Sequence, residues 1–403
     1  MNAQPSHLDS PASWRRLVIA LLIGTVGSIG MWSFVVALPA VQQDFGVTRG
    51  EVSFPYTMTM LGFAFGGVFM GKLADRTGIF LPLVGGALLI SLGYIASGYA
   101  QNLTIFSLLQ ILIGLGTSAS FAPLMIDVSH WFMKRRALAV ALASCGNYLA
   151  GTLWPPLLQL SISSYGWRMS MIGIGVVCIA TLLPLAFLMR QRAPAEAGSH
   201  APPVSRFGTL AVPQNVLFVL LIVAGFACCV AMAMPQVHMV AYCNDLGYGA
   251  ARGAEMLSVM LGLGVVSRIV SGFIADRIGA LSALLLGSTL QGVALFLYLF
   301  FDSMTSLYVI SGLFGLFQGG IVPMYAVIVR EYFPSAKAGG TAGVVIMATL
   351  VGMAAGGWMS GFIFDWTGSY RMAFLNGLAW NLVNVAITAF LLLRSRTPKA
   401  AVA

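Results

Sequence analysis

The chain carries the octet GKLADRTG at residues 71–78 and a second copy, GFIADRIG, at residues 272–279. The two copies lie 201 residues apart in a chain of 403 residues. Other landmarks repeat in the same order at nearly the same spacing: Pro123 with Pro323, Trp131-Phe132 with Tyr332-Phe333, and Arg168-Met169 with Arg371-Met372. A set of motifs that recurs after half the chain length indicates duplication, so we predict two homologous halves.

The composition is that of a membrane protein. Hydrophobic residues make up 59% of the chain, charged residues 8%, and the mean hydropathy is +0.90, whereas soluble domains carry about 25% charged residues. A helix needs about 20 apolar residues to cross the hydrocarbon core of a bilayer. We therefore predict an all-α membrane protein with twelve transmembrane helices, at residues 17–40, 54–73, 80–100, 103–128, 137–160, 169–190, 214–240, 253–274, 280–300, 304–329, 338–363 and 371–394.

A polar, proline-bearing segment at residues 191–213 interrupts this alternation at the centre of the chain. We predict a cytoplasmic linker there, joining pseudo-symmetric six-helix lobes at residues 1–190 and 214–403. No other loop is long enough to hold a soluble domain, and no Gly-Lys-Ser/Thr loop is present to cradle the phosphates of ATP. We therefore expect a protein that is not an enzyme and needs no cofactor or metal.

The basic residues predict the orientation in the membrane. If the loops alternate sides, sixteen Lys and Arg residues lie on the side of the termini, and only Arg49, Arg168, Arg252 and Arg371 lie opposite. This asymmetry is the positive-inside signal and predicts that both termini are cytoplasmic. The net charge of +9 therefore reflects topology, and we expect no nucleic-acid partner. The first fourteen residues lack a cleavable signal, so we expect the first helix to target the chain to the membrane.

Two six-helix halves with the octet after the second and eighth helices resemble the major facilitator superfamily. The resemblance implies alternating access around a site between the lobes. It also implies that each octet is a tight cytoplasmic turn, and that the lobes are locked in one state by four residues: Asp75, Arg76, Asp276 and Arg277.

Residues 131–139, WFMKRRALA, lead into Gly146 and Gly151. They are similar to the signature at the fifth helix of monocarboxylate transporters and their bacterial relatives, although Val140 replaces a usual glycine. The resemblance implies transport of a small monocarboxylate, such as lactate or pyruvate, across a bacterial inner membrane, and we expect a monomer.

Arg268 is the one basic residue left inside an apolar run, about 10 Å from the cytoplasmic end. A guanidinium at mid-membrane costs about 2.5–3.5 kcal/mol, so it usually has a function. It could snorkel to the headgroups, or it could grip a substrate carboxylate with two parallel hydrogen bonds.

Monocarboxylate transporters carry an Arg at this position. Their animal members also have an Asp four residues earlier, where this chain has Gly264, and a Lys in helix 1 that is missing here. One buried cation suits a monoanion.

A 2-hydroxy or 2-oxo acid would also need neutral donors. Each candidate could equally bond a neighbouring helix. We rank Tyr325 first because its helix is expected to line the cavity; the others are Gln318, Asn147, Tyr148, Asn376 and Asn381.

Three routes remain open for a coupled proton. Asp127 could carry it or could form a salt bridge between the lobes, and His238 could titrate near neutral pH. Alternatively, the proton could travel with the substrate at Arg268. Organic-anion exchange, drug/proton antiport and a non-transporting membrane sensor also remain as functions. The chain ends about nine residues past the last helix, which disfavours the sensor.

Overall fold

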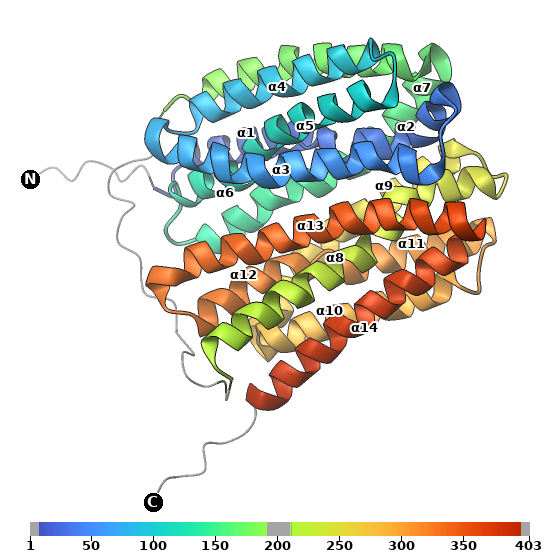
Figure 1. Cartoon of the computed structure of the whole chain (residues 1–403). Coiled ribbons are helices and arrows are strands. Elements are labelled where there is room, and N and C mark those ends of the chain that lie inside the picture. The colour runs from blue at the N-terminus through green and yellow to red at the C-terminus, as the bar shows by residue number, and fades with distance from the viewer. Residues whose placement is uncertain (1–7, 192–209, 211, 396–403) are drawn as a thin grey trace, which may run out of the picture.

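The computed structural model describes residues 8–191, 210 and 212–395, so most of the predicted linker lies outside the described residues. Every element in these ranges is an α-helix (Figure 1). The first half contains α1 (Pro11–Gly27), α2 (Ile29–Phe45), α3 (Arg49–Thr77), α4 (Phe80–Gly98), α5 (Leu103–Ala119), α6 (Ala122–Ser129) and α7 (Arg136–Leu188). The second half contains α8 (Gln214–Asp245), α9 (Ala250–Ile278), α10 (Ala280–Tyr298), α11 (Met304–Gln318), α12 (Ile321–Tyr332), α13 (Ser335–Thr367) and α14 (Tyr370–Ser395).

Eleven helical stretches in the described ranges are long and apolar enough to cross a membrane. The longest, Leu138–Leu188, has 51 residues and would extend about 75 Å, more than twice the ~30 Å hydrocarbon core. Its backbone leaves the helical conformation at Gly166, where φ is 76°. The stretch therefore holds two crossings, which agrees with the twelve predicted.

Some of the predicted continuous helices are broken. The run 103–128 divides between α5 and α6 just before Pro123, and the run 304–329 divides between α11 and α12 just before Pro323. Proline lacks the N–H that a helix interior requires, but it is tolerated in the first turn of a new helix. The two breaks occur at equivalent places in the two halves. The first crossing is also divided, at Ser28.

The two octets form the same turn. Gly78 has φ 81° and Gly279 has φ 87°, values that residues with a side chain rarely adopt. The N–H of Gly78 donates to the carbonyl of Ala74 at 2.8 Å, and that of Gly279 donates to Ala275 at 2.8 Å. One left-handed glycine therefore turns α3 into α4 and α9 into α10.

The helix crossings repeat as well. A Cβ at Gly114 on α5 would collide with the carbonyl of Thr59 on α3. A Cβ at Gly315 on α11 would collide with the carbonyl of Met260 on α9. Both members of the second pair lie 201 residues after those of the first. The duplication predicted from the sequence therefore extends to the packing of individual helices.

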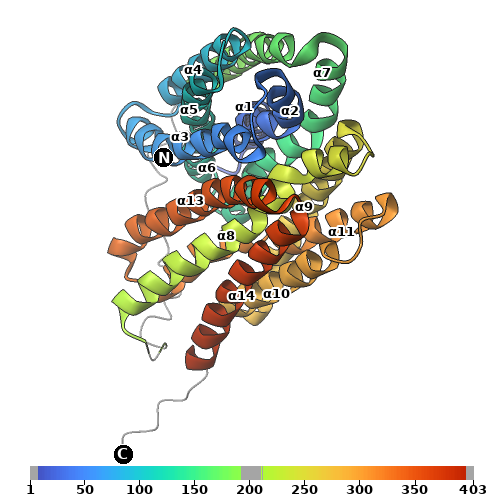
Figure 2. The same ribbon diagram turned by 45° about the vertical axis from the view of Figure 1, so that its right-hand side comes forward.

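The helices form two lobes, α1–α7 and α8–α14 (Figures 1 and 2). In the first lobe α3 packs on α5, α4 on α7 and α1 on α7; the equivalent pairs in the second are α9 on α11, α10 on α14 and α8 on α13. The lobes meet mainly through α3 with α13 and through α7 with α9.

We call the end where α1 begins and α14 ends the proximal end, and the opposite end the distal end. Figures 1 and 2 show α3 and α13 converging toward the distal end and diverging toward the proximal end. These two helices are therefore closest to each other at the distal end.

Candidate functional site

Arg268 lies on α9 at the interface between the lobes. Its Nη1 donates to the carbonyl of Ser144 at 2.9 Å, and its Nε donates to the carbonyl of Gly319 at 3.2 Å. Its guanidinium carbon lies 4.3 Å from the centre of the Tyr148 ring, a cation–π distance. Ser144 and Tyr148 belong to α7 in the first lobe, so the half-buried guanidinium faces the other lobe and does not snorkel into the headgroups.

The charge of Arg268 has no carboxylate partner among the described residues. The ion pairs found there are Arg16–Asp127, Arg49–Asp245, Arg168–Asp44 and Arg252–Glu255. Nη2 of Arg268 makes no hydrogen bond with the described part of the chain. The guanidinium is thus oriented by neutral groups, and its Nη2 edge has no hydrogen-bond partner among the described residues.

Tyr148 and Gln318 join Arg268 in one cluster. The buried Tyr148 hydroxyl donates to Oε1 of Gln318 at 3.3 Å, across the lobe interface. Gln318 is fully buried, and its Nε2 has no partner among the described residues. A buried donor without an acceptor is costly, so such a group usually has a role. The cluster of Arg268, Tyr148 and Gln318 combines a cation with neutral donors.

Gly264 makes room for this cluster. A Cβ at this position would lie 2.5 Å from Cδ1 of Tyr148. The resemblance drawn from the sequence implies an Asp at this position in animal relatives, and the Tyr148 ring occupies the space that such a side chain would need. The departure noted in the sequence therefore has a structural counterpart on the facing helix.

Two of the other predicted ligands are bonded within their own lobes. Asn147 accepts a hydrogen bond from Nε1 of Trp32 at 3.0 Å. Tyr325, which we ranked first, is fully buried and donates to Oδ1 of Asn384 at 2.8 Å. The structure therefore does not join the Tyr325 hydroxyl to the Arg268 cluster.

The two asparagines predicted on the last helix also lie apart from the cluster. Asn381 is buried and donates to the carbonyl of Ser288 at 3.0 Å, within the second lobe. Asn376 is half-buried on α14, and its side chain forms no hydrogen bond with the described residues.

Asp127 forms a salt bridge, but the prediction that this bridge joins the lobes is wrong. Its two carboxylate oxygens accept from Nε and Nη2 of Arg16 at 2.7 and 2.9 Å. Arg16 lies on α1 and Asp127 on α6, in the same lobe, because the break before α6 turns Asp127 toward α1. Arg16 also stacks on Trp131, with 4.5 Å from its guanidinium carbon to the ring centre. The pair stabilises the proximal end of the first lobe.

The signature WFMKRRALA begins in the turn between α6 and α7. The carboxylate of Asp9 accepts from the backbone N–H groups of Met133, Lys134 and Arg135, at 3.1, 3.0 and 3.4 Å. Burial alone would raise the pKa of Asp9. These N–H groups and the charge of Lys134 outweigh burial, and they hold the pKa below its ordinary value. The segment before α1 is thereby fastened to this turn.

A polar network built around the buried Arg49 and Tyr370 closes the distal end. Arg49, at the start of α3, pairs with Asp245 of α8 at 3.0 Å and donates to the hydroxyl of Tyr370 on α14 at 3.0 Å. The carboxylate of Asp365 on α13 accepts from the backbone N–H groups of Arg49 at 2.8 Å and Gly50 at 2.6 Å. It thus caps a helix of the other lobe. We call Arg49, Asp245, Asp365 and Tyr370 the distal seal.

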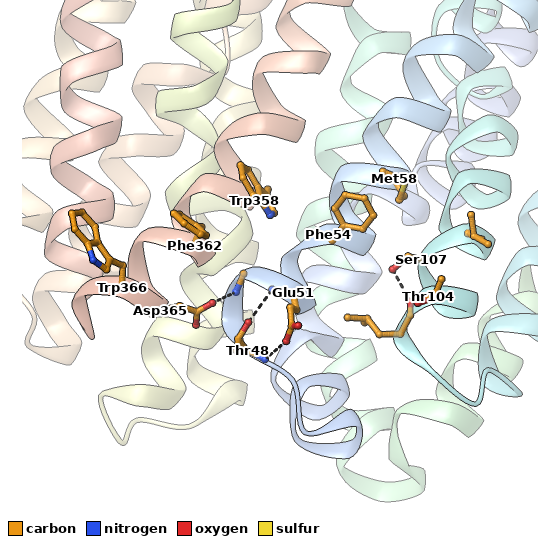
Figure 3. A pocket seen from close by; sticks show the side chains of 13 residues that line it. Thr48, Glu51, Phe54, Met58, Thr104, Ser107, Trp358, Phe362, Asp365 and Trp366 are labelled. Atoms are coloured by element: carbon orange, nitrogen blue, oxygen red, sulfur yellow. Dashed lines mark hydrogen bonds between the residues drawn. The ribbon is translucent and has the colours of Figure 1, made fainter.

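Figure 3 shows Asp365 reaching from α13 to the start of α3. A groove of about 740 Å³ runs along this seam, between α3, α5 and α13. The same view shows the side chains that line it. Four of its thirteen lining residues are aromatic: Phe54, Trp358, Phe362 and Trp366. The groove lies at the distal end and contains none of the predicted ligands, so we do not assign it to the substrate.

His238 lies directly beneath the distal seal. Its ring is fully buried, and its nitrogens are 3.0 Å from the Tyr370 hydroxyl and 2.8 Å from the carbonyl of Gly357. His238 falls near the end of the helix predicted at residues 214–240, but the sequence did not reveal the residues around it.

The octet residues do not lock the lobes in this structure. Asp75, Arg76, Asp276 and Arg277 are exposed at the proximal end, and none takes part in an ion pair of the described part of the chain. The structure thus has a sealed distal end and an unlocked proximal end.

Comparison with known proteins agrees with this architecture. A sequence profile of the Major Facilitator Superfamily matches residues 20–305 and 263–403. Monocarboxylate transporter 13 of Bos taurus is 28% identical over 365 residues, covering 88% of this chain and 82% of that protein. The agnestins efflux protein AgnL12 of Paecilomyces divaricatus is 27% identical over 327 residues, covering 80% and 74%. The crystal structure of a mutant form of the nucleoside transporter NupG has a TM-score of 0.75 at 11% identity, covering 93% of this chain and 99% of that one.

Proposed function

The chain belongs to the Major Facilitator Superfamily, and we propose that it transports a small monocarboxylate, such as lactate or pyruvate, by alternating access. It would act as a secondary transporter and not as an enzyme. The observation that carries this proposal is the unpaired charge of Arg268, held between the lobes by neutral groups. The similarity to monocarboxylate transporters supports the same substrate class.

The chemistry of the cluster suits a monoanion. One guanidinium neutralises one carboxylate, and its planar fork matches the two carboxylate oxygens. Tyr148 and Gln318 provide a hydroxyl and an amide for a 2-hydroxy or 2-oxo group. Because Arg268 contacts Ser144 in the other lobe, a substrate bound there would touch both lobes. Asn147, Tyr325, Asn376 and Asn381 would then support the helices around the site.

We propose proton symport as the energy source. Moving a monoanion inward against a potential costs about 2.3 kcal/mol per 100 mV, and one co-transported proton removes this cost. Asp127 is engaged with Arg16, which favours His238 or the bound substrate as the proton carrier. Uptake should therefore rise as the external pH falls from about 8 to 6, the range around the ordinary His pKa, without a need for Na⁺.

The orientation proposed from the basic residues places the proximal end, with both termini, in the cytoplasm of a bacterial-type inner membrane. A sealed distal end then corresponds to a state open to the cytoplasm. Formation of the octet lock by Asp75, Arg76, Asp276 and Arg277 would belong to the opposite state.

Uptake of radiolabelled L-lactate into proteoliposomes tests this function. We expect accumulation driven by an inward proton gradient and none in empty liposomes. Failure to transport lactate, pyruvate or related acids under any gradient would contradict the proposal and favour a sensor.

Exchange or efflux is the second candidate, because the chain is also similar to a fungal protein named for efflux. Preloading the liposomes with an organic anion distinguishes proton symport from exchange. Uptake that ignores the pH gradient and requires an internal anion would replace symport by exchange.

A further inference from the structure

We propose that His238 is the proton-binding site that opens the distal seal. A proton on its ring would break the hydrogen bonds that join the lobes at this end. The inference deepens the proposed proton coupling and rests on it for its role in transport. The geometry of the seal carries it independently of the substrate.

The hydrogen bonds of His238 fix its tautomer. A carbonyl oxygen can only accept, so the ring nitrogen 2.8 Å from Gly357, Nε2, must carry the hydrogen. In the neutral ring the other nitrogen, Nδ1, is then an acceptor. The Tyr370 hydroxyl, 3.0 Å from Nδ1, donates to it.

Tyr370 connects His238 to the other lobe by a second hydrogen bond. Its oxygen accepts from Nη1 of Arg49 at 3.0 Å. The hydrogen bonds therefore run one way, from Arg49 through Tyr370 and His238 to the carbonyl of Gly357. Arg49 belongs to the first lobe and the other groups belong to the second, so this series of hydrogen bonds crosses the lobe interface.

A second proton on the His238 ring is incompatible with this series of hydrogen bonds. It would turn Nδ1 into a donor, and the buried Tyr370 hydroxyl would lose its acceptor. The Tyr370 oxygen would then face two cations, the imidazolium and the guanidinium of Arg49. Since both groups would repel each other across one hydroxyl, the contact between Arg49 and Tyr370 should weaken.

The surrounding charges are already committed to the seal. Arg49 approaches from α3, Asp365 from α13 and Tyr370 from α14, while Asp245 and Tyr242 share α8 with His238. Asp245 holds the Arg49 guanidinium, and Asp365 holds the backbone of Arg49 and Gly50. An imidazolium would compete with α3 for these carboxylates. Both routes favour separation of the lobes.

Protonation of His238 should favour the open state over the sealed state. The sealed state requires neutral His238, whereas the open state allows it to be protonated by water at the distal face. Acid at the distal face should therefore shift the empty carrier toward the distal-open state.

Labelling of a cysteine inside the seal tests the proposal. Ser53 on α3 is fully buried and lies against Gly361 of α13, so Ser53→Cys reports separation of these helices. The five native cysteines, all buried, are first replaced by alanine, in a background whose thermal unfolding matches that of the natural protein. The probe is a membrane-impermeant thiol reagent added at the distal face, without substrate. Tyr99→Cys, at the exposed Tyr99 near the same end, is the matched control.

We expect labelling of Ser53→Cys to become severalfold faster from about pH 8 to 5.5. Thiol chemistry alone slows over this range because less thiolate is present, so the exposed control should show that slowing. His238→Gln, which does not titrate, should abolish the acid response. Tyr370→Phe keeps the imidazole but removes its link to Arg49; labelling should then be fast at both pH values.

No acceleration at acid pH, or an unchanged acceleration in His238→Gln, would overturn the proposal. L-lactate uptake in the same vesicles distinguishes failure of the His238 proposal from failure of the proposed transport function. Proton-driven uptake without acid-induced labelling contradicts only the role of His238. Acid-induced labelling without any uptake supports the seal and contradicts the transport proposal.

Discussion

The aromatic ring of Tyr148 fills the space beside Gly264, and a Cβ on Gly264 would lie 2.5 Å from its Cδ1 atom. This contact joins α7 of the first lobe to α9 of the second, one turn of helix from Arg268. It fixes the ring against which the Arg268 guanidinium stacks. The lobe interface and the candidate binding site therefore depend on the same pair of residues.

Gly264→Ala should displace the Tyr148 ring and impair the protein. Overpacking of this kind costs about 1–3 kcal/mol, so the melting temperature of the purified protein and its L-lactate uptake should both fall. Gly173→Ala is the control, because a Cβ on Gly173 meets no atom within 4 Å. Equal behaviour of the two variants would show that the ring does not require this glycine.

Tyr148→Phe should alter selectivity while keeping the ring under Arg268. It removes the hydroxyl bonded to Gln318, a contact of about 0.5–1.5 kcal/mol. The apparent KM for L-lactate should rise severalfold, and that for propionate, which lacks the 2-hydroxyl, should change less. Tyr325→Phe removes a hydroxyl bonded to Asn384 and should leave this ratio unchanged. The opposite pattern would place the substrate at Tyr325.

Asp127→Asn should destabilise the first lobe without abolishing proton-driven accumulation. Breaking a buried pair leaves Arg16 uncompensated, at a cost of up to about 3 kcal/mol. Glu255→Gln breaks a pair whose side chains are about half exposed and should cost at most about 1 kcal/mol. Thermal unfolding and uptake measure the two effects. A stable Asp127→Asn protein that no longer responds to the pH gradient would instead make Asp127 the proton carrier.

Asp9→Asn should loosen the turn before α7. It removes one of the two oxygens that accept from Met133, Lys134 and Arg135, so these amides should exchange hydrogen faster at neutral pH. The pKa of Asp9 lies below its ordinary value of 3.8. The stability that Asp9 contributes is therefore complete above pH 3.8 and is lost as the pH falls through the lower pKa of the folded state. Unchanged exchange in the variant would mean that the turn does not depend on Asp9.

The fold could be predicted because its signals are local. Apolar runs report membrane crossings, and the repeated octets report a left-handed glycine turn that the structure contains at Gly78 and Gly279. The breaks before Pro123 and Pro323 were not predicted, since the runs that contain them remain apolar throughout. Composition indicates that a segment lies in the membrane, but it does not show where its backbone leaves the helix.

The candidate site could be predicted only in part. Arg268 stands out because a charge within an apolar run is visible in the sequence, whereas its neighbours depend on which helices meet. Tyr148 and Gln318 come together only because α9 packs on both α7 and α11. The distal seal was missed because Arg49, Asp245 and Asp365 lie near helix ends, where charged residues are ordinary. Substrate binding by Arg268 stays a prediction.

The most direct test of that prediction is L-lactate uptake by Arg268→Lys compared with Arg252→Lys. Both substitutions keep the positive charge on α9, but Arg252 forms an exposed pair with Glu255 and lies far from the cluster along the helix. Lys cannot reproduce the planar fork, and each charge-assisted hydrogen bond contributes about 1.5–3 kcal/mol. We predict that Arg268→Lys inserts normally but loses nearly all uptake, while Arg252→Lys transports as the natural protein does. Near-normal uptake by Arg268→Lys would contradict the account.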